Sequence, residues 1–340
     1  MNNRKLILDA QQNMKIITEK APQPQKGEVL VRVMANGICG SDIHFYKEGR
    51  LGNFVVTKPY TPGHECSGFI AGLGEGVTSF SEGDRVVIEP GIPCGLCGLC
   101  KSGRYNLCKE VVFLSAPPVD GTFCDYIALR QDMVFPFLDK LTYEQAAFVE
   151  PVAVAVHAVN RAGSVYGKDG VIVGAGSIGM LTLQAFKAAG GNRVAMVDVL
   201  DKRLEIAKAL GADEIINPAK TSAAMFDNIG DIVFETAGSA KATETLFNMA
   251  RTGGTVVQVG WPGENIVPMN IANFIDKELY YTSVNRYANA YPTSLSLLAE
   301  GHIKVNELIS KKFDFADAPA AFKYAAENQS QVVKIMVCNQ

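Results

Sequence analysis

Four cysteines lie close together at a spacing that suits a metal ion. Cys94, Cys97, Cys100 and Cys108 fall within 15 of the 340 residues. Four thiolates from one segment can bind zinc in a closed tetrahedral site, which holds a loop but leaves no position for a substrate. Two disulfides or an iron–sulfur cluster are the alternatives. The two-residue gaps make mutual disulfides awkward, and nothing else in the sequence indicates electron transfer. We therefore expect a structural zinc.

A second set of possible metal ligands is scattered along the chain: Cys39, His64, Glu65 and Glu150. Each has a plainer explanation on its own. Cys39 suits a small buried position, His64 a turn, and Glu150 the first turn of a helix, where its charge favours the dipole. Together they offer a thiolate, an imidazole and carboxylates. Three such ligands plus one open position make a catalytic zinc site, provided that the fold brings them together.

A glycine-rich turn follows the apolar run that ends at Val173. Gly174, Gly176 and Gly179 stand between this run and a helical pattern, and this arrangement binds the pyrophosphate of a dinucleotide at the start of the helix. Asp198 comes 19 residues after Gly179, where a carboxylate binds the ribose of NAD and repels the 2′-phosphate of NADP. A tight turn with a helix cap is the alternative.

The two halves of the chain have different patterns. Strand-like runs at 28–36, 65–73 and 84–89, separated by glycine and serine, predict a mainly antiparallel β domain. The second half alternates strands and helices, which predicts a doubly wound parallel sheet with its ligand at the carboxyl ends of the strands. The strands expected there are Val194–Val197, Glu214–Ile216, Asp231–Glu235 and Thr255–Val259. The helices expected there are Asp201–Leu210, Met225–Ile229 and Ala240–Ala250, with Gly211 and Gly253-Gly254 as ends of helices.

The composition of the chain argues against nucleic acid and membranes as binding partners. Hydrophobic residues make up 48% of the chain, the net charge is −3, and neither sign forms a long run. No apolar run approaches the roughly 20 residues of a membrane span, and the first residues lack a secretory core. We expect a cytoplasmic protein that binds a small molecule rather than nucleic acid or a membrane. The strand expected at Glu278–Val284 offers an edge for pairing with another subunit.

Several segments together resemble one enzyme family. They are Gly37-Ile38-Cys39-Gly40-Ser41-Asp42, Gly49–Phe54, Pro62-Gly63-His64-Glu65, the four-cysteine segment, Glu150-Pro151 and Val171–Leu181. The chain is similar over nearly its whole length to zinc-containing medium-chain dehydrogenases, and within them to sorbitol (polyol) dehydrogenases. The Gly49–Phe54 stretch, Glu150 and Asn285-Arg286-Tyr287 point to the polyol branch. The resemblance implies an α/β fold with a GroES-like catalytic domain (1–155 and 290–340), whose lobe 90–110 holds structural zinc, and a Rossmann NAD-binding domain (156–289).

The resemblance also implies roles for single residues. Cys39 and His64 would bind catalytic zinc with a glutamate, for which we expect Glu150, directly or through water, and keep Glu65 as an exchange ligand. Ser41 and His44 match a proton relay, and Asp42 would orient His64. The expected cofactor contacts are Gly174, Gly176, Ile178, Gly179, Asp198, Arg203, Val259, Gly260, Trp261, Val284, Asn285 and Arg286. The expected substrate contacts are Phe45, Phe113, Glu150, Arg286 and Tyr287.

Two departures refine this expectation. Phe45 stands where mammalian-type sorbitol dehydrogenases keep a tyrosine, which removes one hydroxyl contact to substrate. Many of those enzymes also lack the four-cysteine lobe, so a bacterial-style polyol dehydrogenase fits better.

The expected reaction is therefore transfer of a hydride from a secondary alcohol of a polyol to NAD⁺, giving a ketose. We expect two zinc ions per chain and a dimer or tetramer. A 2,3-butanediol, threonine or polyol-phosphate dehydrogenase is the alternative enzyme. A non-enzymatic NAD(P)H-binding crystallin would be expected to lack Cys39, His64 or Glu150, and all three are present.

Overall fold

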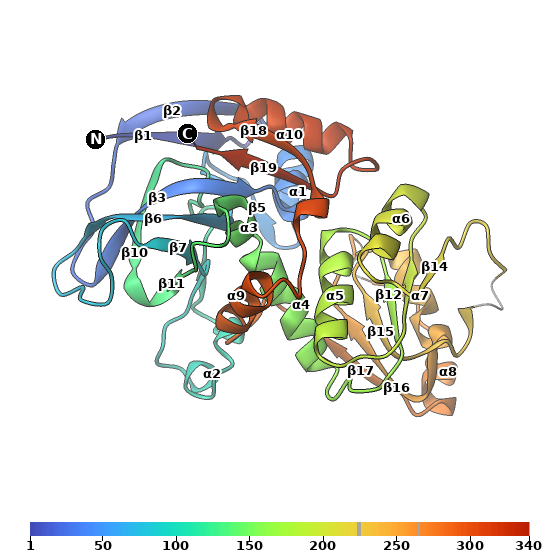
Figure 1. The fold of residues 1–340 in the computed structure, drawn as a ribbon. Coiled ribbons are helices and arrows are strands. Elements are labelled where there is room, and N and C mark those ends of the chain that lie inside the picture. The colour runs from blue at the N-terminus through green and yellow to red at the C-terminus, as the bar shows by residue number, and fades with distance from the viewer. Residues whose placement is uncertain (223–225, 264–265, 340) are drawn as a thin grey trace. The chain divides into compact units, whose positions relative to one another are not determined.

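The computed structural model describes residues 1–222, 226–263 and 266–339. The chain divides into two compact units (Figure 1). Unit 1 comprises Met1–Glu150 and Leu308–Gln340, and unit 2 comprises Pro151–Glu307. The beginning and the end of the chain thus belong to the same unit. Within the described residues no helix is both long and apolar enough to span a membrane.

Unit 1 is built on an antiparallel sheet. The strands of the whole unit are β1 (Asn2–Leu8), β2 (Met14–Lys20), β3 (Glu28–Gly37), β4 (Arg50–Leu51), β5 (Phe54–Val55), β6 (Glu65–Leu73), β7 (Arg85–Ile88), β8 (Gly91–Ile92), β9 (Val112–Phe113), β10 (Tyr126–Arg130), β11 (Val134–Pro136), β18 (Ile309–Asp314) and β19 (Lys334–Cys338). The main sheet runs β11-β7-β6-β3-β19-β18, and β10 also pairs with β3. Only β18 and β19 pair in parallel among its strands. The predicted antiparallel domain is confirmed, and β3, β6 and β7 match its three predicted strands.

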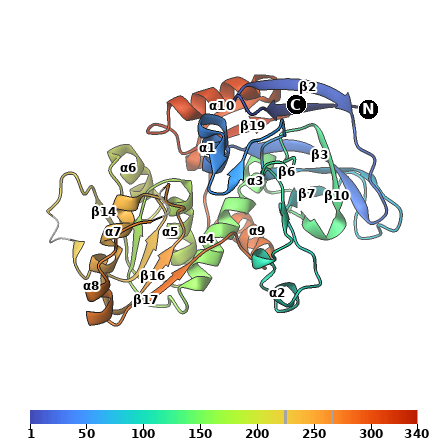
Figure 2. The same ribbon diagram turned by 180° about the vertical axis from the view of Figure 1, so that it is seen from behind.

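The valines of β3 occupy alternate positions and face the core of unit 1. Val29, Val31 and Val33 of β3 are fully buried and belong to one cluster with Ile70 and Val86, as the two-residue period of a strand requires. Its α-helices include α1 (Gly40–Glu48), α2 (Gly98–Lys101), α3 (Tyr143–Ala147) and α10 (Ala318–Glu327). The last strand, β19, lies beside β3 (Figures 1 and 2). The carboxyl-terminal segment is therefore part of the first sheet.

Unit 2 contains a six-stranded parallel sheet. Its strands are β12 (Gly170–Val173), β13 (Val194–Val197), β14 (Glu214–Ile216), β15 (Gly230–Glu235), β16 (Ala250–Gln258) and β17 (Tyr280–Ser283). Their order is β14-β13-β12-β15-β16-β17. The chain moves outward from β12 in one direction and from β15 in the other, so right-handed crossovers place the connecting helices on opposite faces. The predicted doubly wound sheet is confirmed.

The helices of this unit are α4 (Val149–Arg161), which begins in unit 1, α5 (Ser177–Ala188), α6 (Asp201–Ala209), α7 (Ala240–Met249), α8 (Ile271–Asp276) and α9 (Tyr291–Ala299). Gly211 follows the end of α6 with φ +106°, as predicted for a residue just beyond a helix.

Two local predictions need correction. Gly253 and Gly254 do not end a helix, because α7 ends at Met249 and both glycines lie inside β16. A Cβ at Gly254 would lie 2.7 Å from the Arg251 oxygen, so this glycine serves close packing of backbone. The helix expected at Met225–Ile229 begins outside the described residues, and Asn228 forms part of a turn with φ +58°.

Candidate functional site

Three of the scattered ligand residues meet in unit 1. The ligand atoms of Cys39, His64 and Glu65 all lie within 4.8 Å of one another. Strand pairing explains this, because Gly37 at the end of β3 lies opposite Glu65 at the start of β6. His64 and Glu65 are buried. A thiolate, an imidazole and a carboxylate at this separation form a donor set that fits zinc.

Glu150 lies outside this tight group but acts on it electrostatically. The residue is buried in the first turn of α4. Burial alone would lower the pKa of His64, but the charges of Asp42, Cys39 and Glu150 raise that pKa well above its ordinary value. The Glu150 carboxylate is thus near the same centre. Its place among the ligands stays a prediction.

A buried carboxylate lies near the His64 ring. Its Nδ1 lies 3.8 Å from Oδ1 of Asp42 and has no hydrogen-bond partner among the described residues. Asp42 accepts hydrogen bonds from the Cys39 backbone N–H at 3.0 Å and the Ser115 hydroxyl at 3.0 Å. A carboxylate behind one ring nitrogen orients the other toward a metal. The sequence reasoning found Asp42 but missed Ser115. Phe113, expected in the pocket, has its ring centroid 5.6 Å from that of His64.

The expected relay and substrate residues of α1 have different surroundings. Ser41 is half-buried, and His44 is exposed with its Nδ1 3.2 Å from Glu48. Phe45 is buried edge-on to Tyr60, with ring centroids 6.3 Å apart. The Tyr60 hydroxyl is buried, and within the described residues it has no hydrogen-bond partner. A buried hydroxyl therefore lies next to the position where Phe45 lacks one. The roles of Ser41, His44 and Phe45 stay predictions.

A buried lysine that the sequence reasoning missed also belongs to this centre. The ammonium of Lys334 in β19 lies 2.6 and 2.7 Å from the two carboxylate oxygens of Glu65. Burial alone would lower the pKa of Lys334, but Glu65 and Cys39 raise it above the ordinary value, so the group is a cation. The available signal was a lysine inside the apolar run 332–337, where an unpaired charge would be costly.

The four-cysteine lobe has the geometry of a closed zinc site. Cys97 Sγ lies 3.4 Å from Cys100 Sγ and 3.9 Å from Cys108 Sγ, and Cys94 Sγ lies 3.9 Å from Cys100 Sγ. These distances exclude disulfides, whose S–S bond is about 2.0 Å. Tetrahedral ligands at about 2.3 Å from zinc stand about 3.8 Å apart. A multi-iron cluster would separate its cysteines further, because several irons and sulfides would lie between them. The lobe therefore fits zinc.

A buried acid connects this lobe to the sheet. Glu89, which follows β7, accepts a hydrogen bond from the hydroxyl of Tyr105 at 2.8 Å, and Tyr105 lies between the third and fourth cysteines. Burial raises the pKa of Glu89 to about 7, although the Tyr105 hydrogen bond opposes this shift. The acid is therefore partly protonated near neutral pH.

The glycine turn of unit 2 has the shape that a pyrophosphate requires. Gly174 has φ +104°, which favours glycine. A Cβ at Gly179 would lie 1.8 Å from the Gly174 oxygen, whereas one at Gly176 would meet no atom within 4 Å. Ser177 begins α5, and its buried hydroxyl has no hydrogen-bond partner among the described residues. An open glycine and an unpaired hydroxyl at a helix start fit a phosphate. Ile178 follows in the same turn of helix.

The other expected cofactor residues of unit 2 lie at or beyond the carboxyl ends of its strands. Asp198 follows β13 and lines a cavity of about 330 Å³ together with Val173, Gly174 and Ala237. Its carboxylate accepts hydrogen bonds from the N–H groups of Ala175 and Leu200. This places it beside the glycine turn, and its contact with the cofactor ribose stays a prediction. Arg203 lies in the first turn of α6.

A buried carboxylate joins the loop after β15 to the loop after β16, which carries the expected cofactor contacts Val259, Gly260 and Trp261. Glu235 ends β15, and its side chain accepts hydrogen bonds from Ala237 N at 3.0 Å and Gln258 Nε2 at 2.8 Å. Its backbone oxygen accepts the N–H groups of Val259 and Gly260. The loops after β15 and β16 therefore share one anchor, which sequence reasoning missed. Trp261 is exposed.

The last group of expected site residues follows β17. Val284 donates its N–H to the Gln258 oxygen, and Arg286, two residues later, has φ +58°. Tyr287 is buried, with its ring centroid 5.6 Å from that of Tyr291. The cofactor or substrate contacts of Val284, Asn285, Arg286 and Tyr287 stay predictions.

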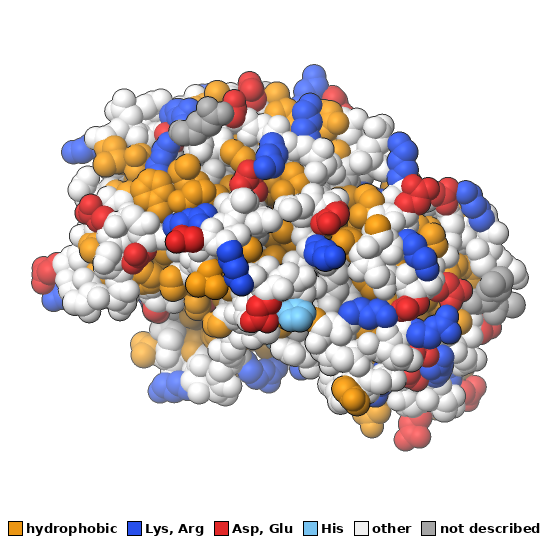
Figure 3. Space-filling model, in the orientation of Figure 1, with side chains coloured by type: hydrophobic (Ala, Val, Ile, Leu, Met, Phe, Trp, Pro, Cys, Tyr) orange, Lys and Arg blue, Asp and Glu red, His pale blue; other side chains and the backbone are white. Residues whose placement is uncertain are grey.

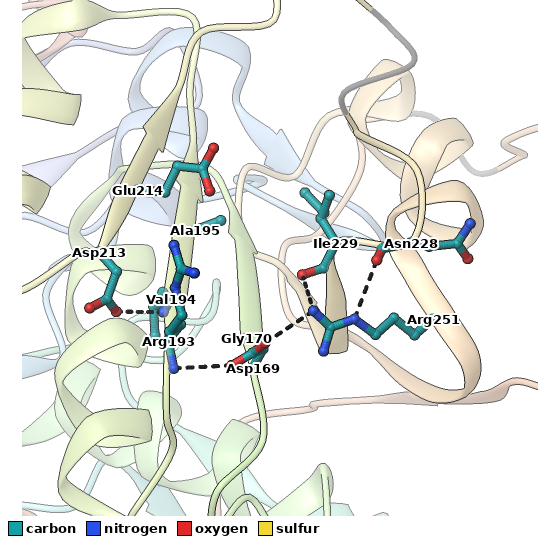
Figure 4. Close-up of a pocket in the computed structure, with 10 residues that line it drawn as sticks. All are labelled: Asp169, Gly170, Arg193, Val194, Ala195, Asp213, Glu214, Asn228, Ile229 and Arg251. Atoms are coloured by element: carbon teal, nitrogen blue, oxygen red, sulfur yellow. Dashed lines mark hydrogen bonds and ion pairs between the residues drawn. The ribbon is translucent and has the colours of Figure 1, made fainter.

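A second cavity lies at the amino ends of the parallel strands, opposite the cavity near Asp198. It measures about 230 Å³ and is lined by the residues labelled in Figure 4, which lie at or just before the amino ends of the strands. Arg251 pairs with Asp169 at 3.0 Å and with Asp231 at 3.2 Å, and Asp213 accepts the Val194 N–H. These carboxylates are used in ion pairs and strand caps. The cavity near Asp198 is therefore the better ligand site.

Comparison with known families agrees with this geometry. Residues 25–139 match the family model described as the alcohol dehydrogenase GroES-like domain, and residues 177–300 match the model described as zinc-binding dehydrogenase. The chain is 40% identical to the sorbitol dehydrogenase of Bacillus subtilis (strain 168), and the match covers 99% of this chain and 97% of that protein.

Two solved structures show the same fold. The L-idonate 5-dehydrogenase of Escherichia coli has a TM-score of 0.93 and 31% identity, with 99% of this chain and 98% of that chain covered. The 2R,3R-butanediol dehydrogenase of Bacillus subtilis has a TM-score of 0.91 and 30% identity, with 99% and 100% covered.

The Glu89→Gln variant tests the buried acid at the lobe. The folded-state pKa of about 7 lies above the ordinary value of 4.5, so folding favours the protonated acid. This stabilisation is complete below pH about 4 and is lost as pH rises through about 7, by up to about 3 kcal/mol. We expect denaturant unfolding to show the wild type losing stability relative to Glu89→Gln between pH about 5 and 8.

The exposed Glu82→Gln variant serves as the control and should follow the wild type at every pH. A difference between Glu89→Gln and the wild type that does not change with pH would contradict the assignment.

Proposed function

The chain belongs to the zinc-dependent medium-chain dehydrogenases, in their polyol dehydrogenase family, and we propose that it oxidises a secondary alcohol of a polyol, of the sorbitol or xylitol kind, to a ketose with NAD⁺. The observation that carries the substrate class is the match to a sorbitol dehydrogenase over 99% of the chain. The Gly49–Phe54 stretch and Glu150 support the same class.

The residues of the centre have separate roles in the proposed reaction. When bound at Cys39, His64 and Glu150, zinc supplies a Lewis acid that lowers the pKa of a substrate hydroxyl, while NAD⁺ accepts the hydride. Asp42 orients the His64 ring. Ser41 and His44 carry the released proton to solvent, and the exposure of His44 suits the outer end of such a relay.

A 2,3-butanediol dehydrogenase is the second candidate, supported by the structural match at 30% identity. Both reactions oxidise a secondary alcohol that stands next to another hydroxyl, so the centre alone does not separate them. The size of the alcohol is the distinguishing property.

A substrate panel combined with Glu150→Ala tests the proposal. We expect NADH formation with sorbitol or xylitol to exceed that with 2R,3R-butanediol, threonine or galactitol 1-phosphate. Glu150→Ala should lose about 100-fold or more in kcat because the zinc loses a ligand. NADH binding, measured by fluorescence, should change little, and the exposed Glu82→Ala variant should behave as wild type. Unchanged turnover in Glu150→Ala would reject its role at the zinc.

The preference for NAD over NADP is tested at Asp198. Its carboxylate suits the two ribose hydroxyls and repels a 2′-phosphate. Because this side chain also accepts two backbone N–H groups, Asp198→Asn is a better test than alanine, since it removes the charge and keeps the shape. We expect the NAD-to-NADP ratio of kcat/KM to fall about tenfold or more in Asp198→Asn. An unchanged ratio would assign the preference elsewhere.

We propose that the protein is a homo-oligomer joined through β17. Within the described residues this strand pairs only with β16, and exposed apolar side chains lie on it and on α8, including Tyr280 at 70% and Ile275 at 68%. Such an edge is a template for pairing with a second copy. Figure 3 shows one face of the molecule, on which charges of both signs are interspersed with hydrophobic side chains.

Light scattering tests this interface. Tyr280→Glu combined with Ile275→Glu should reduce the measured mass by at least half, because charges would be buried between subunits. Leu138→Glu, an equally exposed apolar position in unit 1 at 61%, should leave the mass unchanged. A monomeric wild type would contradict the proposal.

We also propose that the protein is cytoplasmic. Its eight free cysteines support this location, because disulfides are rare in the reducing cytosol.

A further inference from the structure

Glu235 is a buried carboxylate whose hydrogen-bond donors among the described residues are all neutral. The residue ends β15 and is fully buried. Its Oε1 accepts the Ala237 N–H at 3.0 Å, and its Oε2 accepts the Gly238 N–H at 3.2 Å and the Gln258 side-chain amide at 2.8 Å. Burial raises the pKa of this carboxyl, and the donors oppose that shift. Since a buried charge without partners is costly, the carboxylate depends on each of these donors.

The Gln258 amide connects this carboxylate to the loop after β16. Gln258 ends β16, and its Nε2 donates both to Glu235 and to the Gly260 backbone oxygen, at 2.8 and 2.9 Å. Its Oε1 accepts the hydroxyl of Tyr281 in β17 at 3.3 Å. One side chain therefore links three neighbouring strands, β15, β16 and β17 (Figure 1).

Glycines bring the loops after β15 and β16 into backbone contact. A Cβ at Gly260 would lie 2.3 Å from the Gly238 nitrogen, and one at Gly238 would lie 2.7 Å from the Trp261 oxygen. Gly260 donates its N–H to the Glu235 backbone oxygen, and its own oxygen accepts the Gln258 amide. The orientation of Gly260, and with it the place of the loop Val259–Trp261, is therefore set by Glu235 and Gln258 together.

This loop and Asp198 lie on opposite sides of the glycine turn in the order of the strands. The turn follows β12 and Asp198 follows β13, whereas β15 and β16 lie on the other side of β12. A dinucleotide binds across the point where the strand order reverses. If its adenosine half lies near Asp198 and its pyrophosphate at the glycine turn, its nicotinamide half extends toward β15 and β16.

We propose that Gln258 is a positioning residue for the nicotinamide half of the cofactor. Its amide, oriented by Tyr281, connects Glu235 to Gly260 and so fixes the loop toward which the nicotinamide extends. The inference deepens the proposed function and rests on its dinucleotide site. Leucine at position 258 would keep the bulk of the side chain but leave the Gly260 oxygen without this donor. The loop would then shift to recover a hydrogen bond, because an unsatisfied buried group is costly.

A comparison of NADH with ADP-ribose separates the two halves of the cofactor without any turnover. ADP-ribose carries the adenosine and both phosphates but lacks the nicotinamide. In Gln258→Leu we expect the Kd for NADH to rise about tenfold, because a hydrogen bond that fixes the loop is lost, and the Kd for ADP-ribose to stay within about twofold of the wild type. Titration calorimetry measures both ligands on the same protein.

Tyr281→Phe is a milder change that should leave the fold intact, because this tyrosine is 43% exposed. It keeps the ring that packs on Phe247 and removes the hydroxyl that orients the Gln258 amide. We expect the Kd for NADH to rise about threefold and that for ADP-ribose to stay unchanged. Tyr166→Phe is the matched control and should bind both ligands as the wild type does. Tyr166 is 83% exposed, and its hydroxyl has no hydrogen-bond partner among the described residues.

Two results would overturn the inference. One is a Gln258→Leu protein whose affinity for NADH is unchanged or falls only as much as its affinity for ADP-ribose. The other is a Tyr281→Phe protein that binds NADH as tightly as Tyr166→Phe does, and this result decides if Gln258→Leu does not fold. A wild type that binds neither ligand would reject the dinucleotide site itself. A wild type that binds both but oxidises no polyol would reject only the proposed substrate class.

Discussion

The pairing of β3 with strands on both of its edges is the constraint on which the metal centre depends. On one edge β6 places Glu65 opposite Gly37, and on the other β19 places Met336 opposite the same glycine. The chain then leaves β3 directly into the segment that carries Cys39. Residues about 300 positions apart in the sequence thereby reach one buried point, and the hydrogen bonds of the sheet fix their separation.

That buried point brings several acidic groups together with one lysine. Asp42, Glu65 and Glu150 contribute buried carboxyl groups, and the ammonium of Lys334 pairs with Glu65. A buried charge without a partner costs several kcal/mol. A divalent ion at this point would offset part of the negative charge.

Features built from residues close together in the sequence could be predicted, whereas features that join distant segments could not. The four-cysteine lobe and the glycine turn could be predicted because their residues are neighbours in sequence, and local geometry does the rest. The three strands of the β domain and the parallel sheet followed from hydrophobic periodicity. The scattered ligands could be named, but their meeting depended on strand register. Lys334 was missed because its partner is 269 residues away, and its only trace was a charge in an apolar run. The prediction at Gly253-Gly254 was wrong because a glycine pair can either end a helix or let backbone segments pack closely within a strand.

The division of the chain into two units has a consequence for the order of biosynthesis. Unit 2 is one continuous stretch, Pro151–Glu307, whereas unit 1 needs residues from 308 onward to complete its sheet. On the ribosome the nucleotide-binding half can fold as soon as it emerges, whereas the Ala35–Gly37 end of β3 lacks its pairing with β19 until the last residues have been made. The first half of the polypeptide to be translated is thus the last to be finished.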